Sequence, residues 1–252
     1  MIVTAVKTRK VLPNACTLFE LLDESLTEVR EDSVVVITSK VVSLCEGAVV
    51  PLDSISKEEL IKKEAERYVV LPMSDYGVIF TVIKNTLIPN AGIDESNAGG
   101  VYVLWPRDPQ ATANTVRAYL CKRFGLQHVG VVIVDSTGRP LRWGMGGISI
   151  AHSGFKEVRN YIGEPDLFGR EFVHETAAVS GGLAAAAVLV MGEGAECTPL
   201  AVISDVQFVE FQSGDPSPKE LEALHISLEN DMFSPMLQAV PWTDGGASGA
   251  KN

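Results

Sequence analysis

Residues 131–147, VVIVDSTGRPLRWGMGG, join a continuous apolar run to a polar, glycine-rich turn. The apolar run is typical of a buried β-strand that ends on Asp135. A carboxylate at a strand end is rigidly placed, and the hydroxyl of Ser136 is a further ligand for a hard cation. Arg139 and Arg142 offer planar guanidinium groups for a phosphate or a carboxylate. Taken alone, the stretch fits an ordinary loop with an Asx turn and two solvated arginines at least as well.

Apolar and alternating segments predict further strands, and capping residues predict the helices. Strands are expected at 2–7, 33–39, 77–83, 100–105, 129–135 and 199–206. Helices are expected after Ser56, from Asp108 to Gly125, after Ser217, and from about 174 to 191. The strands outnumber the helices and do not alternate strictly with them, which favours an α+β architecture over a doubly wound sheet.

The composition is that of a globular protein with an acidic surface. Of the 252 residues, 46% are hydrophobic and 21% are charged, which is enough for a sizeable core. Lys and Arg number 21 against 32 Asp and Glu, so the net charge is −11. That balance argues against nucleic acid or an anionic membrane as the main partner. It allows an anionic substrate wherever a metal or local arginines neutralise the charge.

Neither export nor membrane insertion is expected from the sequence. The N-terminal residues MIVTAVKTRKVLP contain no long apolar run, and the apolar stretch 183–192 is too short to span a bilayer. The four cysteines form no CxxC pair, which fits a reducing compartment and predicts a cytoplasmic protein. The four histidines have no HxxxH or HExxH spacing, so a histidine-bound zinc is not expected.

Two further acids occur in glycine-rich turns beside predicted strands. Asp94 lies in NAGIDESN, residues 90–97, and Glu193 lies in the turn MGEG. Mg²⁺ and Mn²⁺ are held by a few carboxylates together with substrate phosphates. If Asp94, Asp135 and Glu193 converge, they would repel one another without a cation between them, which predicts a metal site. Each acid alone also fits a simple turn residue, and Glu95 is more typical of a solvated side chain.

Four motifs carry a resemblance to a known family. They are NAGIDESN, DSTGRPLRWG (135–144), GEPDLFGREF (163–172) and LVMGEG (189–194). From about residue 8 to 206 the sequence resembles the coenzyme F420:L-glutamate ligases, although the general nucleotide motifs GxxxxGK[ST] and GxGxxG are absent. The resemblance implies an α+β fold with mixed and antiparallel sheets in two interwoven lobes, and an intertwined homodimer. It also implies an enzyme that uses GTP and a divalent metal to join L-glutamate to the phosphorylated deazaflavin coenzyme F420-0.

The resemblance assigns roles to particular residues. The implied ligands of Mg²⁺ or Mn²⁺ are Asp94, Asp135, Ser136 and Glu193. The implied nucleotide contacts are Leu12, Pro13, Asn14, Ala15, Ser39, Lys40, Leu44, Asn97, Met191, Gly192, Glu193, Gly194, Ala195, Glu196, Cys197 and Thr198. Asp94 and Asp135 are expected to be catalytic through the metal. From the residues themselves, Arg139 or Arg142 is expected to orient the acceptor or L-glutamate and the other to form a structural ion pair, with Arg139 favoured because it is nearer to Asp135. Phosphoryl transfer from GTP to the acceptor carboxylate would give an acyl phosphate, which the amine of glutamate attacks.

Three departures from the family pattern leave the acceptor open. Leu44 stands where lysine is usual, and a leucine side chain cannot contact phosphate, so Lys40 is expected to compensate. Ser136 replaces a usual threonine and keeps the hydroxyl. Residues 180–182 read Ser-Gly-Gly where Ala-Asp-Glu is common. The alternatives are a sister glutamate ligase that acts on another carboxylate, such as a folate, and a non-catalytic nucleotide-binding homologue.

One catalytic domain of two lobes is expected over residues 1–240. The remaining residues, 241–252, are rich in glycine and are expected to form a tail.

Overall fold

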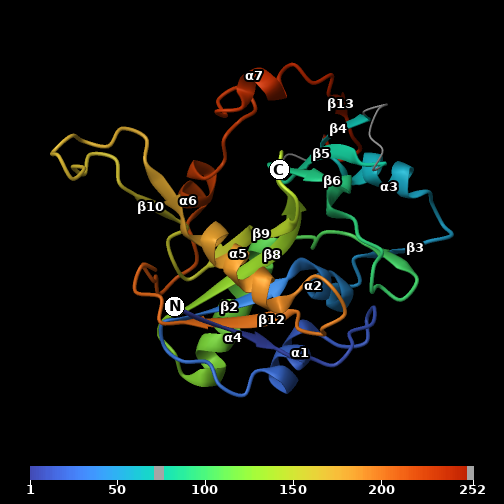
Figure 1. Ribbon diagram of the computed structural model, residues 1–252. Helices are drawn as coiled ribbons and strands as arrows, with labels where there is room; N and C mark the ends of the chain where they lie inside the picture. The colour runs from blue at the N-terminus through green and yellow to red at the C-terminus, as the bar shows by residue number, and fades with distance from the viewer. Residues whose placement is uncertain (71–76, 249–252) are drawn as a thin grey trace. The chain divides into compact units, whose positions relative to one another are not determined.

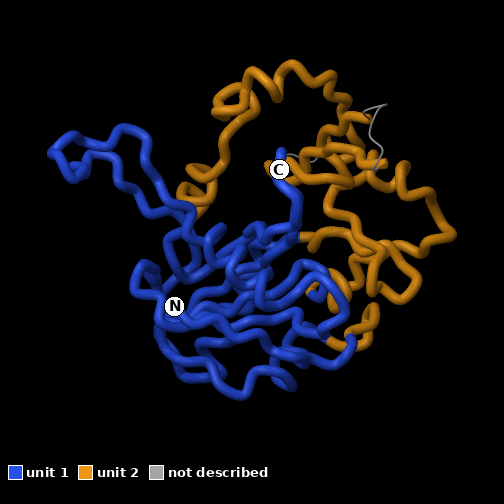
Figure 2. Tube along the Cα trace, viewed as in Figure 1, with its two compact units in different colours: residues 1–10, 17–41, 108–216 blue, residues 11–16, 42–107, 217–252 orange. Residues whose placement is uncertain are grey.

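In the computed structural model, residues 1–70 and 77–248 are described, and they form two compact units (Figure 2). Unit 1 consists of Met1–Lys10, Thr17–Val41 and Asp108–Pro216. Unit 2 consists of Val11–Cys16, Val42–Arg107 and Ser217–Asn252, of which 71–76 and 249–252 lie outside the described residues. Each unit is therefore assembled from segments that lie far apart in the sequence.

Unit 1 is built on a five-stranded sheet in the order β1-β12-β2-β8-β9 (Figure 1). The strands are β1 Ile2–Val6, β2 Ser33–Thr38, β8 Val129–Gly138, β9 Met145–Ser153 and β12 Leu200–Ser204. β2 and β8 are parallel, with Thr38 opposite Val134, and the other neighbouring pairs are antiparallel. The sheet is therefore mixed, and the predicted α+β class is confirmed.

Helices cover this sheet because its central strands are apolar on both faces. Val36 of β2 and Val134 of β8 belong to the core that α5, Val179–Met191, completes. Their neighbours Val35 and Ile133, which point to the opposite face, are also fully buried. The helix α4, Pro109–Phe124, packs on β8 and β9, and Figure 1 shows α5 crossing the sheet.

The helix α1, Leu18–Ser25, is tied to α4 through aromatic and polar contacts. Phe19 packs on Tyr119 with ring centroids 4.5 Å apart, and the Tyr119 hydroxyl donates a hydrogen bond to the carboxylate of Asp23. That hydrogen bond raises the pKa of Tyr119, because a phenolate would lose the bond and face the Asp23 charge.

A two-stranded hairpin extends from unit 1 (Figure 1). It is formed by β10 Val158–Asn160 and β11 Thr176–Ala178, which pair antiparallel. The intervening loop carries Leu167 and Phe168, which are 98% and 95% exposed. Two neighbouring large apolar side chains left this open are unusual on a monomer surface.

Unit 2 contains a four-stranded antiparallel sheet in the order β13-β4-β5-β6 and a separate pair, β3-β7. The strands are β3 Val49–Pro51, β4 Arg67–Val70, β5 Ile79–Ile83, β6 Thr86–Pro89, β7 Val101–Val103 and β13 Thr243–Asp244. The helices are α3 Lys57–Glu64, α6 Pro218–Ala223, α7 Ser234–Leu237 and the 3₁₀ turn η1 Asn90–Gly92. The helix α2, Ser39–Glu46, begins in unit 1 and ends in unit 2.

The predicted helix starts are largely confirmed. Ser56 caps α3 in a capping box, Asp108 caps α4, which Gly125 ends, and Ser217 caps α6. All six predicted strands are present, with boundaries shifted by up to a few residues. The prediction that a helix begins near 174 was wrong: residues 176–178 pair with β10 as β11, so α5 begins at Val179. Within the described part of the chain, no helix combines the length and the apolar character that crossing a membrane requires.

Candidate nucleotide and metal site

The carboxyl ends of the parallel strands β2 and β8 bring several predicted site residues together in unit 1. Thr38 and Val134 are the last residues paired between the two strands, so Ser39 and Asp135 come directly after this pairing. The prediction that the strand ends on Asp135 was wrong, because β8 continues to Gly138 through pairing with β9. Ser39 opens α2 and is buried, and Lys40 next to it is partly exposed. The carboxyl edge of parallel strands is the usual position for a ligand in α/β sheets.

Asp135 and Ser136 are presented to this edge by β8. The Asp135 Oδ1 atom accepts a hydrogen bond from the Ser136 N–H at 2.7 Å, which fixes the carboxylate at the surface. The Ser136 hydroxyl donates to Glu193 Oε2 at 3.1 Å, although the two residues are 57 positions apart. Three of the four predicted metal ligands, Asp135, Ser136 and Glu193, therefore lie in one unit at one edge.

A glycine in β9 explains how Glu193 reaches Ser136. Gly147 is paired with Ser136, and a Cβ on Gly147 would lie 2.3 Å from the carbonyl oxygen of Ala184 in α5. Only glycine permits this approach of helix and strand. The close packing directs the C-terminal end of α5, and the turn that carries Glu193, to the edge where β8 presents Ser136.

The turn 191–198 is stabilised by its own polar groups. Gly192 has a φ of +81° and ends α5, and the Gly194 N–H donates to Glu196 Oε2 at 2.8 Å. Thr198 Oγ1 donates to the carbonyl of Met191 at 2.5 Å. The carbonyl of Cys197 accepts from the N–H of Thr8, which ties the turn to the segment after β1. Glu196 is thus used inside the turn, whereas Glu193 points to β8.

Arg139 and Arg142 lie in the exposed turn between β8 and β9. The Arg142 N–H donates to the carbonyl of Arg139 at 3.2 Å, and its guanidinium donates to the carbonyl of Leu141. The Arg139 guanidinium lies over Gly146, with Nη2 3.4 Å from the position of a Cβ there. Gly146 and Gly147 are neighbours in β9, so their side-chain positions point to opposite faces of the sheet. Arg139 therefore lies on the face to which Asp135 points, and not on the face where Ser136 meets Glu193.

Asp94 lies in unit 2, in a turn whose backbone is unusually constrained. Asn90, Ala91 and Gly92 all have positive φ, at 56°, 53° and 67°. Asp94 Oδ1 accepts the N–H groups of Glu95 and Ser96 at 2.6 and 2.8 Å. The Asp94 backbone bridges to Val103 in both directions, at 3.1 and 2.7 Å, which anchors the turn to the end of β7.

The remaining predicted nucleotide residues cluster near this turn within unit 2. The Asn14 N–H donates to the carbonyl of Leu44 at 2.9 Å, and the side chain of Leu12 is 3.6 Å from the position of a Cβ on Gly99. Gly99 follows Asn97, which has a φ of +53°. Leu44 itself is 3% exposed, so its side chain belongs to the core.

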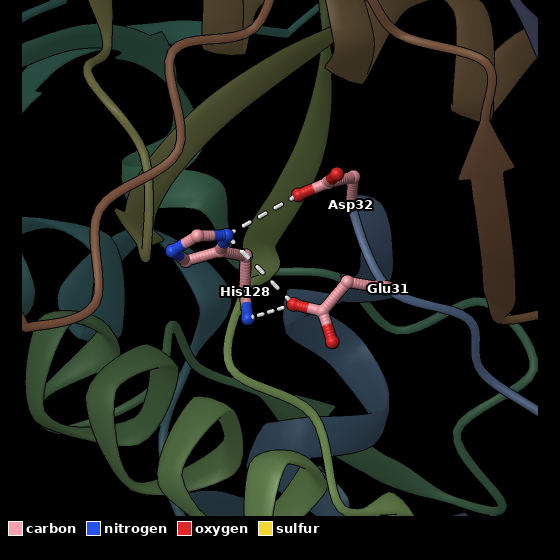
Figure 3. Close-up of side chains that lie close together, drawn as sticks. All are labelled: Glu31, Asp32 and His128. Carbon is pink, nitrogen blue, oxygen red and sulfur yellow. Dashed lines mark hydrogen bonds and ion pairs between the residues drawn. The ribbon is translucent and has the colours of Figure 1, made fainter.

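A second group of possible metal ligands lies at the opposite, amino ends of β2 and β8 (Figure 3). Nδ1 of His128 lies 3.5 Å from Asp32 Oδ1 and 3.8 Å from Glu31 Oε1. Glu31 also accepts the backbone N–H groups of Gln127 and His128, which is a structural use of its carboxylate. The sequence contained one signal for this group that the motifs missed. Glu31 and Asp32 directly precede the strand predicted at 33–39, and His128 directly precedes the strand predicted at 129–135.

Comparison with known proteins decides the family. The model of the family F420-0:Gamma-glutamyl ligase matches residues 12–205, which include both carboxyl-edge segments and the turn 191–198. The chain belongs to this family. The coenzyme F420:L-glutamate ligase of Methanopyrus kandleri is 35% identical over 243 residues, which cover 89% of this chain and 94% of the relative.

Other relatives in the family support the same assignment. The coenzyme F420:L-glutamate ligase of Methanocaldococcus jannaschii is 36% identical over 201 residues, or 74% of this chain and 80% of the relative. The protein of that name from Archaeoglobus fulgidus is 32% identical over 231 residues, or 86% and 89%. The F420-0:gamma-glutamyl ligase family forms carbon–nitrogen bonds, so the chain is a member of an enzyme family, as the sequence motifs predicted.

Proposed function

We propose that this protein is a GTP- and divalent-metal-dependent amide ligase that joins L-glutamate to coenzyme F420-0 through an acyl-phosphate intermediate. The observation that best supports the proposal is the meeting of Ser136 and Glu193, 3.1 Å apart, beside Asp135 at the carboxyl edge of β2 and β8. Lys40 directly follows β2, so the same unit carries both carboxylates and an ammonium group.

The donor set fits a hard cation. Asp135, Ser136 and Glu193 offer oxygen atoms only, which suits Mg²⁺ or Mn²⁺, and we assign Asp94 as the fourth ligand. When bound, the cation would neutralise charge that develops on the phosphoryl oxygens. The hydrogen bond from Ser136 N–H to Asp135 holds that carboxylate in position before any ligand arrives.

The other residues bind and orient the substrates. We assign the GTP site to Leu12–Ala15, Ser39, Lys40, Leu44, Asn97 and the turn 191–198. Lys40 offsets phosphate charge, and the backbone of Leu44, rather than its buried side chain, faces the nucleotide. Arg139 or Arg142 binds the anionic acceptor or L-glutamate, and Arg139 is favoured because it is nearer to Asp135 in the sequence.

The reaction follows two balanced steps. The γ-phosphoryl group of GTP passes to a carboxylate oxygen of the acceptor, and GDP leaves. The amine of L-glutamate then attacks the acyl carbon, the C–O bond to phosphate breaks, and the ammonium proton passes to a carboxylate or to water.

We infer further that the active form is an intertwined homodimer in the cytoplasm, with residues 1–240 as one catalytic domain and 241–252 as a tail. The exposed pair Leu167 and Phe168 supports self-association, because a second copy would cover this apolar surface. Light scattering at micromolar concentration tests the dimer. A monomer with intact activity would contradict it, and Phe168→Ser should shift a dimer towards monomer.

The deciding experiment is turnover with GTP, Mn²⁺ and L-glutamate against a panel of carboxylate acceptors, followed by mass spectrometry. We expect a mass increase of one glutamyl residue on F420-0, and its loss in Asp135→Asn. Asp53→Asn is the matched control, because it makes the same change at an exposed carboxylate that belongs to neither group of possible metal ligands. Equal activity of both variants at saturating Mn²⁺ would contradict the assignment of Asp135.

The residues at the start of α5 favour a second candidate for the carboxylate acceptor of glutamate. Gly182 is exposed, with open space where a side chain would lie, so the acid common in the family is missing from this surface. Ser180 is buried and donates to Glu157 Oε1 at 2.7 Å. Glutamylation of a folate but not of F420-0 in the same panel would identify a sister ligase.

A further inference from the structure

A cavity of about 360 Å³ lies within unit 2, and its charged lining residues belong neither to the motifs nor to the proposed nucleotide site. Its volume is at the lower end of the range for small-molecule sites, about 300–1,000 Å³, and suits a ligand of amino-acid size. Ile83, Ile93 and Trp105 contribute buried apolar surface to its lining.

The same cavity is lined by two cations and one acid. These are Lys84, Arg107 and Glu64, all of which belong to unit 2. Among the ion pairs of the described residues, none involves any of these three side chains. Charged groups that line one cavity without an ion-pair partner can pair with a charged ligand.

Hydrogen bonds place both cations at this cavity. Lys84 lies in the tight turn between β5 and β6, where its N–H donates to Glu66 Oε1 at 2.8 Å and its ammonium group donates to the carbonyl of Arg107 at 2.7 Å. The N–H of Arg107 donates to Glu46 Oε1 at 2.7 Å. Glu46 and Glu66 are thus used to fix the backbone. An ammonium group has three donors, so Lys84 keeps two for a ligand, and Arg107 keeps its planar fork.

We propose that this cavity binds an α-amino dicarboxylate, with Lys84 and Arg107 on its two carboxylates and Glu64 on its ammonium group. The apolar lining would take the methylene groups between the charges. The inference rests on the proposed function, in which L-glutamate is the co-substrate. Ile93 of the lining directly precedes Asp94, and the Asp94–Val103 bridge holds the two sides of the cavity together within unit 2.

The contribution of each of the three charged side chains to ligand binding can be measured separately. Equilibrium dialysis with radiolabelled L-glutamate is carried out on the full chain, with and without Mn²⁺ and a non-hydrolysable GTP analogue. Arg107→Lys and Lys84→Gln should each weaken binding by about tenfold or more, the usual effect of losing a charge-assisted hydrogen bond. Absence of saturable binding under all these conditions would overturn the proposal.

Glu64 is tested by the choice of ligand. Glutarate has both carboxylates of L-glutamate but no ammonium group, so the wild-type protein should prefer L-glutamate. Glu64→Gln should abolish most of that preference while glutarate binding is kept, which also shows that the variant is folded. Lys63→Gln is the matched control, since it removes a charge from the neighbouring position of α3 that does not line the cavity. An unchanged preference in Glu64→Gln would remove Glu64 from the site.

The outcome for the cavity is distinguishable from the outcome for the proposed function. If the wild-type protein glutamylates an acceptor and all three variants keep its KM for L-glutamate, the cavity assignment is wrong and the ligase proposal stands. If binding depends on the three side chains but no acceptor is glutamylated, the ligase proposal is wrong and the cavity assignment stands.

Discussion

Gly92 is the position at which one added methyl group should disturb unit 2 most. Its φ is +67°, and an ideal Cβ would lie 2.0 Å from Nε1 and 2.5 Å from Cδ1 of the Trp105 indole. Trp105 is only 5% exposed, so its ring could move aside only into the cavity that it lines, with loss of its packing contacts. A left-handed backbone costs a non-glycine residue about 1–2 kcal/mol, and overpacking costs about 1–3 kcal/mol. Gly92→Ala should therefore lower the free energy of unfolding by about 2–5 kcal/mol.

The measurement is urea unfolding, followed by tryptophan fluorescence and circular dichroism. Gly99→Ala is the matched control: its φ is +69°, in the same unit, but its nearest neighbour is Leu12 Cδ2 at an ordinary 3.6 Å. It should show only the backbone cost of about 1–2 kcal/mol. Equal losses in the two variants would refute the packing argument, and no loss in either would refute the backbone argument as well. Binding of L-glutamate should also weaken in Gly92→Ala, because Trp105 lines the cavity.

Three further predictions concern metal binding, pH and the core. Glu193→Gln keeps an acceptor for Ser136 but removes a charge, so Mn²⁺ affinity measured by electron paramagnetic resonance should fall by about tenfold or more; an unchanged affinity would exclude Glu193 as a ligand. The pKa of Tyr119 is raised above its ordinary value by the hydrogen bond to Asp23, so this bond should stabilise the protein fully below the pKa of the unfolded chain, about 10. The stability difference between wild type and Tyr119→Phe should therefore shrink as the pH rises above about 10, and a constant difference would contradict this. Leu44→Lys should lower the free energy of unfolding by at least about 2 kcal/mol, because it places an ammonium group where the leucine side chain is only 3% exposed. If urea unfolding is unchanged and GTP binds more tightly, residue 44 can instead face the phosphates.

Local signals in the sequence predicted the helix boundaries well. The capping box of Ser56 and the pair Asp108 and Gly125 act on backbone groups within one turn, so no tertiary information is needed. The start of α5 was missed because the choice between helix and strand at residues 176–178 depends on pairing with β10, which lies far back in the chain. Helix propensity is a local property of the sequence and contains no information about a strand-pairing partner.

The candidate site was predictable in its residues but not in its arrangement. Turn chemistry and motif resemblance identified Asp135 and Glu193 separately. The contact of Glu193 with Ser136, next to Asp135, depends on the close packing of α5 against Gly147. The cavity of unit 2 was not predicted at all, because its charged residues Glu64, Lys84 and Arg107 belong to no motif and are joined only by the fold.

The net charge of −11 raises a physical question about an enzyme whose proposed substrates are all anions. Screening limits the reach of exposed charges to about 8 Å at physiological ionic strength, so binding depends on the charges that line each site. Lys40 directly follows β2, and Arg139 lies in the turn after β8, in the unit that carries Asp135, Ser136 and Glu193. Lys84 and Arg107 line the cavity of unit 2. Positive charge is thus placed where phosphate and carboxylate would bind, and the excess of acids elsewhere opposes non-specific binding of larger polyanions such as nucleic acids.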